Sequence, residues 1–186
     1  MASILVQTTD FTGFYKINQT TQTTAVLQSF IDKNEKSIIR RLLGLELGDL
    51  FIADVAAFTP VTARYLALFN PIAIQISGLS TFVDDYYQYG NGHIYESRGM
   101  KEIILGMLYD LYVTDQQHLQ SQSGVVRSEV DAAKALGFDN AARQGETRHN
   151  SIIDDYEAVQ YFARTEAATY PEYDGLRITV KYSAII

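Results

Sequence analysis

The amino-acid sequence predicts a mainly α-helical protein: a helical bundle around one central hydrophobic helix, with an extended segment at each end. Three observations predict this class. A stretch of about 20 residues that begins near Ser97 is apolar nearly all round a helical wheel. Residues 23–44 and 151–167 are amphipathic with a helical period. Strand-like alternation is confined to residues 72–76 and to the tail at 175–186.

The central helix is expected to be buried, because apolar side chains cover two of its faces. One face holds Met100, Ile103, Ile104, Met107, Leu108, Leu111 and Tyr112, and a second strip holds Leu105, Tyr109 and Val113. Ser97 is the expected N-cap. The length would suffice for a bilayer span, but the charges interspersed along the helix oppose one. We therefore expect a core helix of a soluble domain.

Composition limits the classes of function. A chain of 186 residues suits a single domain, 1–186. Its net charge of −7 disfavours binding to the nucleic-acid backbone and suits a surface that must not adhere to DNA. There is no cysteine, and therefore no disulfide, thiolate metal site or cysteine nucleophile. The 13 tyrosines are suited to interfaces as well as to cores.

The first part of the chain reads as an extended arm followed by a helix. Residues 1–22 lack a helical period and carry irregularly spaced aromatic anchors. The helical body, 23–170, opens with a helix capped by Thr23 or Thr24 and stopped by Gly44. Lys33, Lys36 and Arg40 lie opposite its apolar face. They form either a solvated helix face or a basic stripe that meets acids on a neighbouring subunit.

Shorter elements follow. Gly48 and Asp49 restart a short helix that runs to Phe58, and Pro60 ends it. Residues 61–69 are a further helical piece, and residues 72–76 alternate like a short strand. The loop at 77–97 is long enough to be functional or disordered. Its tyrosines are Tyr86, Tyr87, Tyr89 and Tyr95.

The last third is expected to hold two helices and a strand. An Ala-rich helical pattern covers 128–136, and residues 139–148 are weakly helical and broken by Gly145. A clearer helix opens at Asn150 or Ser151 and ends at Tyr170, before a proline. The tail at 175–186 is a strand that needs a partner for its backbone, and we predict pairing with another chain. Its candidate contact residues are Ile178, Val180, Tyr182, Ile185 and Ile186.

No motif predicts catalysis or a cofactor. The sequence has no glycine-rich phosphate loop, and its three histidines lack ligand spacing. Asp154, Asp155 and Glu157 are either a cation site or acids in the first turn of a helix, where the dipole favours them. We expect no catalytic residue, no metal and no cofactor.

Five segments in order resemble the head–tail connector (adaptor) proteins of tailed bacteriophages, and most closely those of phages of Bacteroidetes-type hosts. The similarity covers roughly residues 24–175 by the order and spacing of segments. The segments are IRRLLG at 39–44, SRGMKEII at 97–104, LYDLYVTDQ at 108–116, GVV at 124–126 and YPEYDG at 170–175.

The resemblance implies a structural virion protein of the head–tail joint, made in the cytoplasm of the host bacterium. Such a protein would form a ring of twelve copies under the portal protein and extend the DNA channel, without sequence-specific DNA binding. It would offer a docking surface to tail or further neck proteins, with no catalytic residue and no membrane association. The Lys33–Lys36–Arg40 stripe, the tyrosine-rich loop and the tail are the candidate interfaces.

Two other readings remain open from the residues alone. The chain could be a non-enzymatic module that binds a peptide or protein through its tyrosine-rich loop. It could also be an enzyme with a carboxylate-bound metal at Asp154, Asp155 and Glu157.

Overall fold

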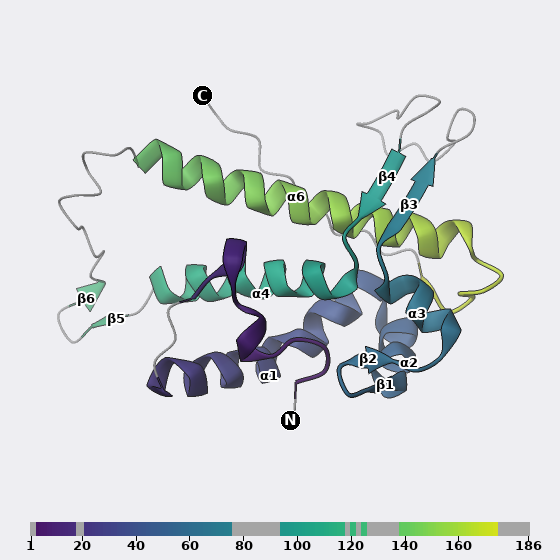
Figure 1. The fold of residues 1–186 in the computed structure, drawn as a ribbon, viewed down its shortest axis with the longest axis horizontal. Coiled ribbons are helices and arrows are strands. Elements are labelled where there is room, and N and C mark those ends of the chain that lie inside the picture. The colour runs from purple at the N-terminus through teal and green to yellow at the C-terminus, as the bar shows by residue number, and fades with distance from the viewer. Residues whose placement is uncertain are drawn as a thin grey trace.

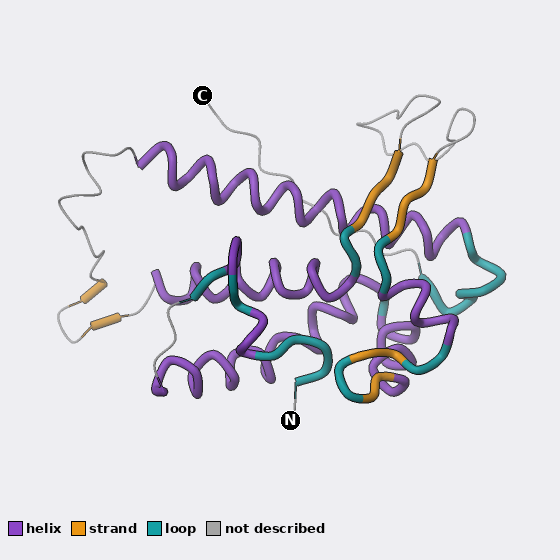
Figure 2. Tube along the Cα trace, in the orientation of Figure 1, coloured by secondary structure: helices purple, strands orange, loops and turns teal. Residues whose placement is uncertain are grey.

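Helices make up most of the part of the chain that the structure describes (Figures 1 and 2). This computed structural model describes residues 3–17, 21–75, 94–117, 120–121, 124–125 and 138–174. Within them the helices are α1 (Thr21–Leu43), α2 (Leu45–Asp54), α3 (Ala63–Phe69), α4 (Met100–Gln117) and α6 (Phe138–Thr165). The mainly helical class predicted from the sequence is confirmed. The predicted helix at 128–136 and the tail at 175–186 lie outside the described residues.

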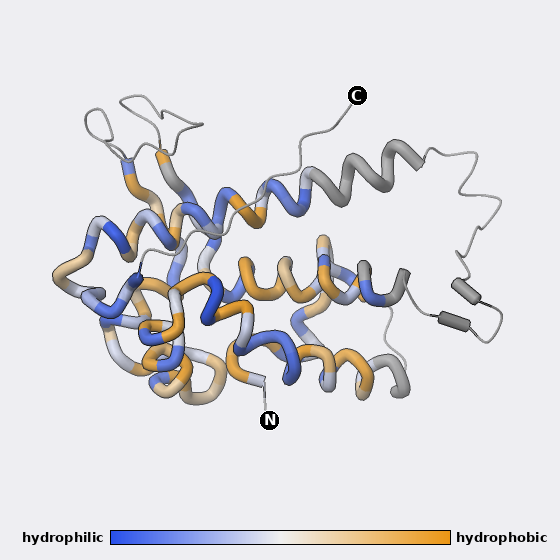
Figure 3. Tube along the Cα trace, turned by 180° about the vertical axis from the view of Figure 1, so that it is seen from behind, coloured by the Kyte–Doolittle hydropathy of each residue, from blue (hydrophilic) through white to orange (hydrophobic). Residues whose placement is uncertain are grey.

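The three long helices lie one above another, with α4 between α1 and α6 (Figure 1). Hydrophobic and hydrophilic residues alternate along α1, as expected of an amphipathic helix (Figure 3). On α1, Leu27, Ile31, Ile38 and Leu42 are fully or almost fully buried, and their spacing of four and seven residues, one and two helical turns, sets the inner face. None of the helices in the described part combines the length and the apolar character that a membrane span needs.

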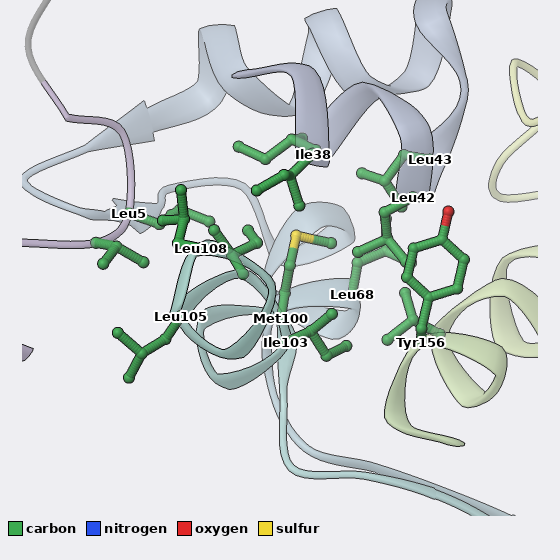
Figure 4. Close-up of a cluster of buried hydrophobic side chains, with 14 of the residues drawn as sticks. Leu5, Ile38, Leu42, Leu43, Leu68, Met100, Ile103, Leu105, Leu108 and Tyr156 are labelled. Carbon is green, nitrogen blue, oxygen red and sulfur yellow. The ribbon is translucent and has the colours of Figure 1, made fainter. Parts of the chain in front are cut away.

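The core gathers around the start of α4. Met100, Ile103, Ile104 and Leu108 are fully buried, and Figure 4 shows Met100 among side chains from α1, α3 and α6. Burying each such side chain stabilises the fold by roughly 1.5–3 kcal/mol. Toward the outer end of this helix the predicted burial was wrong for Leu111, which is 41% exposed, and right for Tyr112, which is 6% exposed.

Helices α4 and α6 approach closely at Gly106. A Cβ atom there would lie 2.6 Å from Cδ1 of Ile152 on α6 and 3.1 Å from the hydroxyl oxygen of Tyr15 in the N-terminal arm. A side chain here would force Ile152 to shift, so glycine allows the two helices to approach this closely. Three segments far apart in the sequence meet at this one position.

The junction of α1 and α2 differs from the prediction. Gly44, at φ 82°, separates the two helices, so α2 begins at Leu45 rather than at Asp49. Helix α2 then ends at Asp54. Strands β1 (Val55–Ala56) and β2 (Thr59–Pro60) form a tight antiparallel hairpin instead of the expected helical turns to Phe58.

A second hairpin projects from the helical body. Strand β3 (Ile72–Gln75) confirms the predicted strand, and it pairs antiparallel with β4 (Ile94–Ser97). Both strands pack against α6 and extend beyond it (Figures 1 and 2). Strand β4 was not predicted, because it falls at the end of the expected loop. Ser97 is not the N-cap of α4 either: the carbonyl of Gly99 accepts the first helical N–H bonds, and the Ser97 hydroxyl accepts from the Gly99 N–H at 3.1 Å.

Helix α6 is longer than expected. It begins at Phe138 and passes through Gly145 without a break, so the predicted start at Asn150 or Ser151 was wrong. A glycine inside a helix costs only about 1 kcal/mol, which the packing of the remaining turns can offset. The amphipathic period predicted for 151–167 is correct for Ile152, Tyr156, Val159 and Ala163, which are buried, but the helix ends at Thr165 rather than at Tyr170.

The second half of α6 and the residues that follow it contact the first 65 residues of the chain. The hydroxyl of Tyr156 donates to the Arg41 carbonyl at 2.5 Å, and that of Tyr170 donates to the Arg64 carbonyl at 2.7 Å. Arg64 also forms an ion pair with Glu172. A Cβ atom on Gly44 would lie 2.7 Å from a carboxylate oxygen of Asp174. The last described residues therefore complete the α1–α2 junction.

Candidate interaction surfaces

The basic stripe on α1 is partly used within the chain. Arg40 forms a two-point ion pair with Asp49 on α2, with Nε–Oδ1 and Nη2–Oδ2 distances of 2.8 Å. The ammonium of Lys36 lies 3.8 Å from the same carboxylate, whereas Lys33 is exposed. Arg40 thus connects two adjacent helices, and Lys33 is the member of the stripe most open to a neighbour. Asp49 was predicted as a helix cap, which is why the sequence did not suggest this pair.

The remaining predicted interface residues fall mostly outside the described part of the chain. Outside it lie the loop tyrosines Tyr86, Tyr87 and Tyr89 and the tail residues Ile178, Val180, Tyr182, Ile185 and Ile186. The backbone of Tyr95 lies in β4, opposite Ile74 of β3. The structure therefore places one end of the tyrosine-rich segment on the projecting hairpin.

Asp155 has a structural contact that explains its burial. It is 4% exposed, and its two carboxylate oxygens accept from the backbone N–H of Arg98 at 2.9 Å and from Nε of the same arginine at 2.8 Å. Charge-assisted, multiply bonded pairs of this kind are strong, and this one fixes the β4–α4 junction to α6. Asp154 and Asp155 lie in the middle of α6 rather than in its first turn. Within the described residues no group of three or more histidine or acidic side chains could hold a metal ion.

Glu35 anchors the N-terminal arm, a role that the sequence did not reveal. The arm contains two short 3-10 turns, η1 (Thr8–Asp10) and η2 (Gly13–Tyr15), and it buries Phe11 and Tyr15 in the body. Glu35 is 1% exposed and accepts the backbone N–H groups of Ile4, Leu5 and Val6 at 2.6, 2.7 and 2.8 Å. Burial raises the pKa of this carboxyl group, and the three N–H groups oppose the shift. The one feature of the sequence that could have indicated this role is that Glu35 is an acidic residue beside the apolar face of α1.

Of the seven exposed large apolar side chains in the described residues, six form two groups at opposite ends of the body, and the seventh, Ile94, lies on β4. The first, which we call the Phe14 group, lies on η2, the first half of α1 and the second half of α4, in the left half of Figure 1. It consists of Phe14, Val26 and Leu111. The second, the Leu50 group, lies on α2 and just after β2, in the right half of Figure 1. It consists of Leu45, Leu50 and Val61.

A small cavity lies between the start of the arm and the β1–β2 hairpin. Its volume is about 210 Å³, and it is lined by Ser3, Ile4, Ile52, Val55, Ala57 and Phe58. The two residues of the turn, Ala57 and Phe58, have φ values of 49° and 65°. Such a turn normally carries Asn and Gly, so its backbone is strained here.

Asp54 holds this strained turn in place. Its carboxylate accepts the backbone N–H groups of Val61 and Thr62, each at 2.8 Å, and the Thr62 hydroxyl. The hydroxyl bond, followed by the backbone bonds, lowers the pKa of Asp54, so the carboxylate is charged at neutral pH. The turn was not predicted, because the residues up to Phe58 have the pattern of a helix.

A histidine–carboxylate pair joins α4 to α6. Nδ1 of His149 lies 3.2 Å from a carboxylate oxygen of Asp110. Burial raises the pKa of Asp110, and the bond to His149 opposes that shift. Next to it, the Arg148 guanidinium lies 4.6 Å from the centre of the Phe14 ring, so this cluster supports the exposed aromatic side chain.

No protein-family model, curated protein or solved structure matches this chain. The arrangement of its surfaces is therefore the basis for assigning a function.

Proposed function

We propose that this protein is a structural head–tail connector of a tailed bacteriophage. It assembles into a ring under the portal protein, extends the DNA channel and presents a docking surface to tail or further neck proteins. The observation that carries the proposal is the separation of the Phe14 group from the Leu50 group along the long axis (Figure 1). Two different apolar groups at opposite ends of a subunit favour head-to-tail contacts, and such contacts form a ring when the rotation from one subunit to the next closes.

The size of the two groups indicates how assembly proceeds. Their six side chains are 41–67% exposed. Burying them in one interface that covers both groups would stabilise that interface by about 6 kcal/mol. Association itself costs about 4–15 kcal/mol. A pair of free subunits is therefore weakly bound. A template such as the portal, together with ring closure, supplies the remaining contacts.

Several finer features belong to the same proposal. They are a helical bundle centred on α4, a tail at 175–186 that pairs with a neighbouring chain, and twelve copies in the ring. The net charge of −7 supports passage of DNA through the channel without adhesion. Lys33, exposed on α1, is available to an acid of the next subunit.

The test is assembly on the portal of the phage that encodes the chain, viewed by negative-stain electron microscopy. Wild-type protein should add a ring beneath the portal, and Leu50→Asp should abolish that ring. Ala67→Asp, at an exposed position of α3 outside both groups, is the matched control and should assemble normally. Equal assembly of both variants would remove the basis of the proposal, as would the absence of the protein from purified virions.

The tail is tested separately. Deletion of residues 176–186 should abolish portal binding and leave the helical circular-dichroism signal unchanged. Unchanged binding would show that the tail is not the contact.

A further inference from the structure

We infer that the cavity beside the β1–β2 hairpin is a socket for the Phe14 side chain of a neighbouring copy of this chain. The inference rests on the proposed self-assembly and names the contact through which one subunit recognises the next. It joins one residue of the Phe14 group to a site adjoining the Leu50 group.

The size of the socket suits a single aromatic ring. Its volume is about 210 Å³, and it is open to solvent; five of its six lining residues have apolar side chains, and polar atoms of the same residues also face it. An apolar cavity of about 150 Å³ is sufficient for benzene, whereas sites for drug-sized ligands occupy about 300–1,000 Å³. The socket is therefore large enough for a phenylalanine ring and too small for most cofactors.

Phe14 has the properties of an interface anchor. It is 55% exposed and is the only aromatic among the exposed large apolar side chains of the described residues. It is also held in position: its ring packs edge-on against buried Tyr15 at 5.3 Å, with the Arg148 guanidinium 4.6 Å from its centre. A pre-positioned aromatic side chain loses little entropy on binding, which is typical of residues that dominate interfaces.

The charges near the two partners are complementary. Exposed Lys16 follows Phe14 by two residues, and Arg148 lies against its ring. The socket side carries the ionised Asp54, next to lining residue Val55. Opposite charges around an apolar contact orient the approach of two subunits and accelerate their encounter.

The strained turn is a further indication of a binding role. Ala57 and Phe58 keep positive φ values although neither residue favours them. Strained backbone tends to persist at ligand and partner sites, where its shape is needed. Here the turn forms one wall of the socket.

Phe14 and the socket occupy different parts of each subunit. The Phe14 ring lies against α6 through Arg148, whereas the socket opens between Ser3 and the β1–β2 hairpin. The socket of one copy is thus filled by another copy, and the contact repeats head to tail.

Crosslinking of the full-length chain tests this contact directly, because the natural sequence contains no cysteine. Thr12→Cys places a thiol two residues before Phe14, and Thr59→Cys places one beside the socket, both at exposed positions. The two single variants are mixed on the portal and treated with a short bismaleimide. The mixture should give a covalent dimer in at least about tenfold higher yield than Thr12→Cys mixed with Ala67→Cys.

The role of the aromatic ring is tested in the same assay. Adding Phe14→Ala to the Thr12→Cys variant should reduce the crosslink at least about tenfold, whereas Phe14→Leu should retain most of it. Circular dichroism checks that each variant is folded. Rings on the portal without the mixed crosslink would overturn the socket and leave the connector function standing. A crosslink that depends on Phe14, in a protein that never binds a portal, would overturn the connector function and leave the socket standing.

Discussion

Glu35 holds the N-terminal arm through three backbone bonds, and its replacement gives a quantitative test of that arrangement. Glu35→Ala leaves the N–H groups of Ile4, Leu5 and Val6 without their acceptor. The bonds from Leu5 and Val6 are fully buried, and a buried donor without a partner costs about 1–3 kcal/mol. The Ile4 bond is partly buried, so water can replace it. We therefore expect the free energy of unfolding to fall by about 2–6 kcal/mol.

Glu35→Gln should cost much less. One carboxylate oxygen accepts both buried N–H groups, and the other accepts only the N–H of Ile4. A glutamine can keep its carbonyl oxygen on the two buried donors and turn its amide NH₂ toward Ile4. Only the partly buried bond is then lost, at about 1 kcal/mol. Glu46→Ala, at an exposed position on α2, is the matched control and should change stability by less than about 0.5 kcal/mol.

Urea denaturation followed by circular dichroism measures these differences, and hydrogen exchange at residues 4–6 reports whether the arm stays attached. The expected order of destabilisation is Ala, then Gln, then the Glu46 control. If the Ala and Gln variants of Glu35 were equally stable, or if exchange at residues 4–6 did not accelerate in the Ala variant, the carboxyl group would not be the anchor of the arm.

Three further changes test other parts of the fold. Gly106→Ala should lower the free energy of unfolding by about 1–3 kcal/mol, because the new Cβ would lie 2.6 Å from Ile152 in a packed core; an unchanged denaturation midpoint would contradict this. Ala57→Asn should raise the free energy of unfolding by about 1 kcal/mol, because asparagine tolerates the φ of 49° better than alanine does. A loss of stability would show that the backbone of this turn is not strained. Burial raises the pKa of Tyr156 from 10.0 to about 12, so stability from this residue is present below pH 10 and is lost as the pH rises to 12. The loss should reach about 2.7 kcal/mol and be absent in Tyr156→Phe, and parallel pH profiles for the two proteins would disprove it.

The elements that could be predicted from the sequence are those with a strong local pattern. Helix α1 was expected from residue 23 to Gly44 and runs over Thr21–Leu43, because its apolar side chains repeat over about four turns. Helix α4 was predicted for the same reason. Gly44 and the short strand β3 were also recognisable, since a stop signal and strict alternation are local features.

The elements that were missed depend on residues distant in the sequence. Strand β4 contains four residues and gains its partner only when β3 lies beside it. The continuity of α6 depends on its packing against α4 and the hairpin, which outweighs the cost of Gly145.

The candidate surfaces were equally hard to foresee. Nothing local indicates that Arg40 would pair with Asp49 across a helix junction, or that Phe14 would be the exposed aromatic of an arm whose other aromatics are buried. Exposure and pairing are properties of the folded chain, and the sequence contains no period that encodes them.

The return of the chain to the α1–α2 junction has a consequence for biosynthesis. The first two helices are made well before the groups that complete their junction, since 115 residues separate Arg41 from Tyr156 and Asp174 comes later still. Helices α1 and α2 therefore stay incompletely packed until residues 156–174 have left the ribosome. A nascent chain that stalls before residue 170 should remain sensitive to protease, which delays the appearance of an assembly-competent subunit.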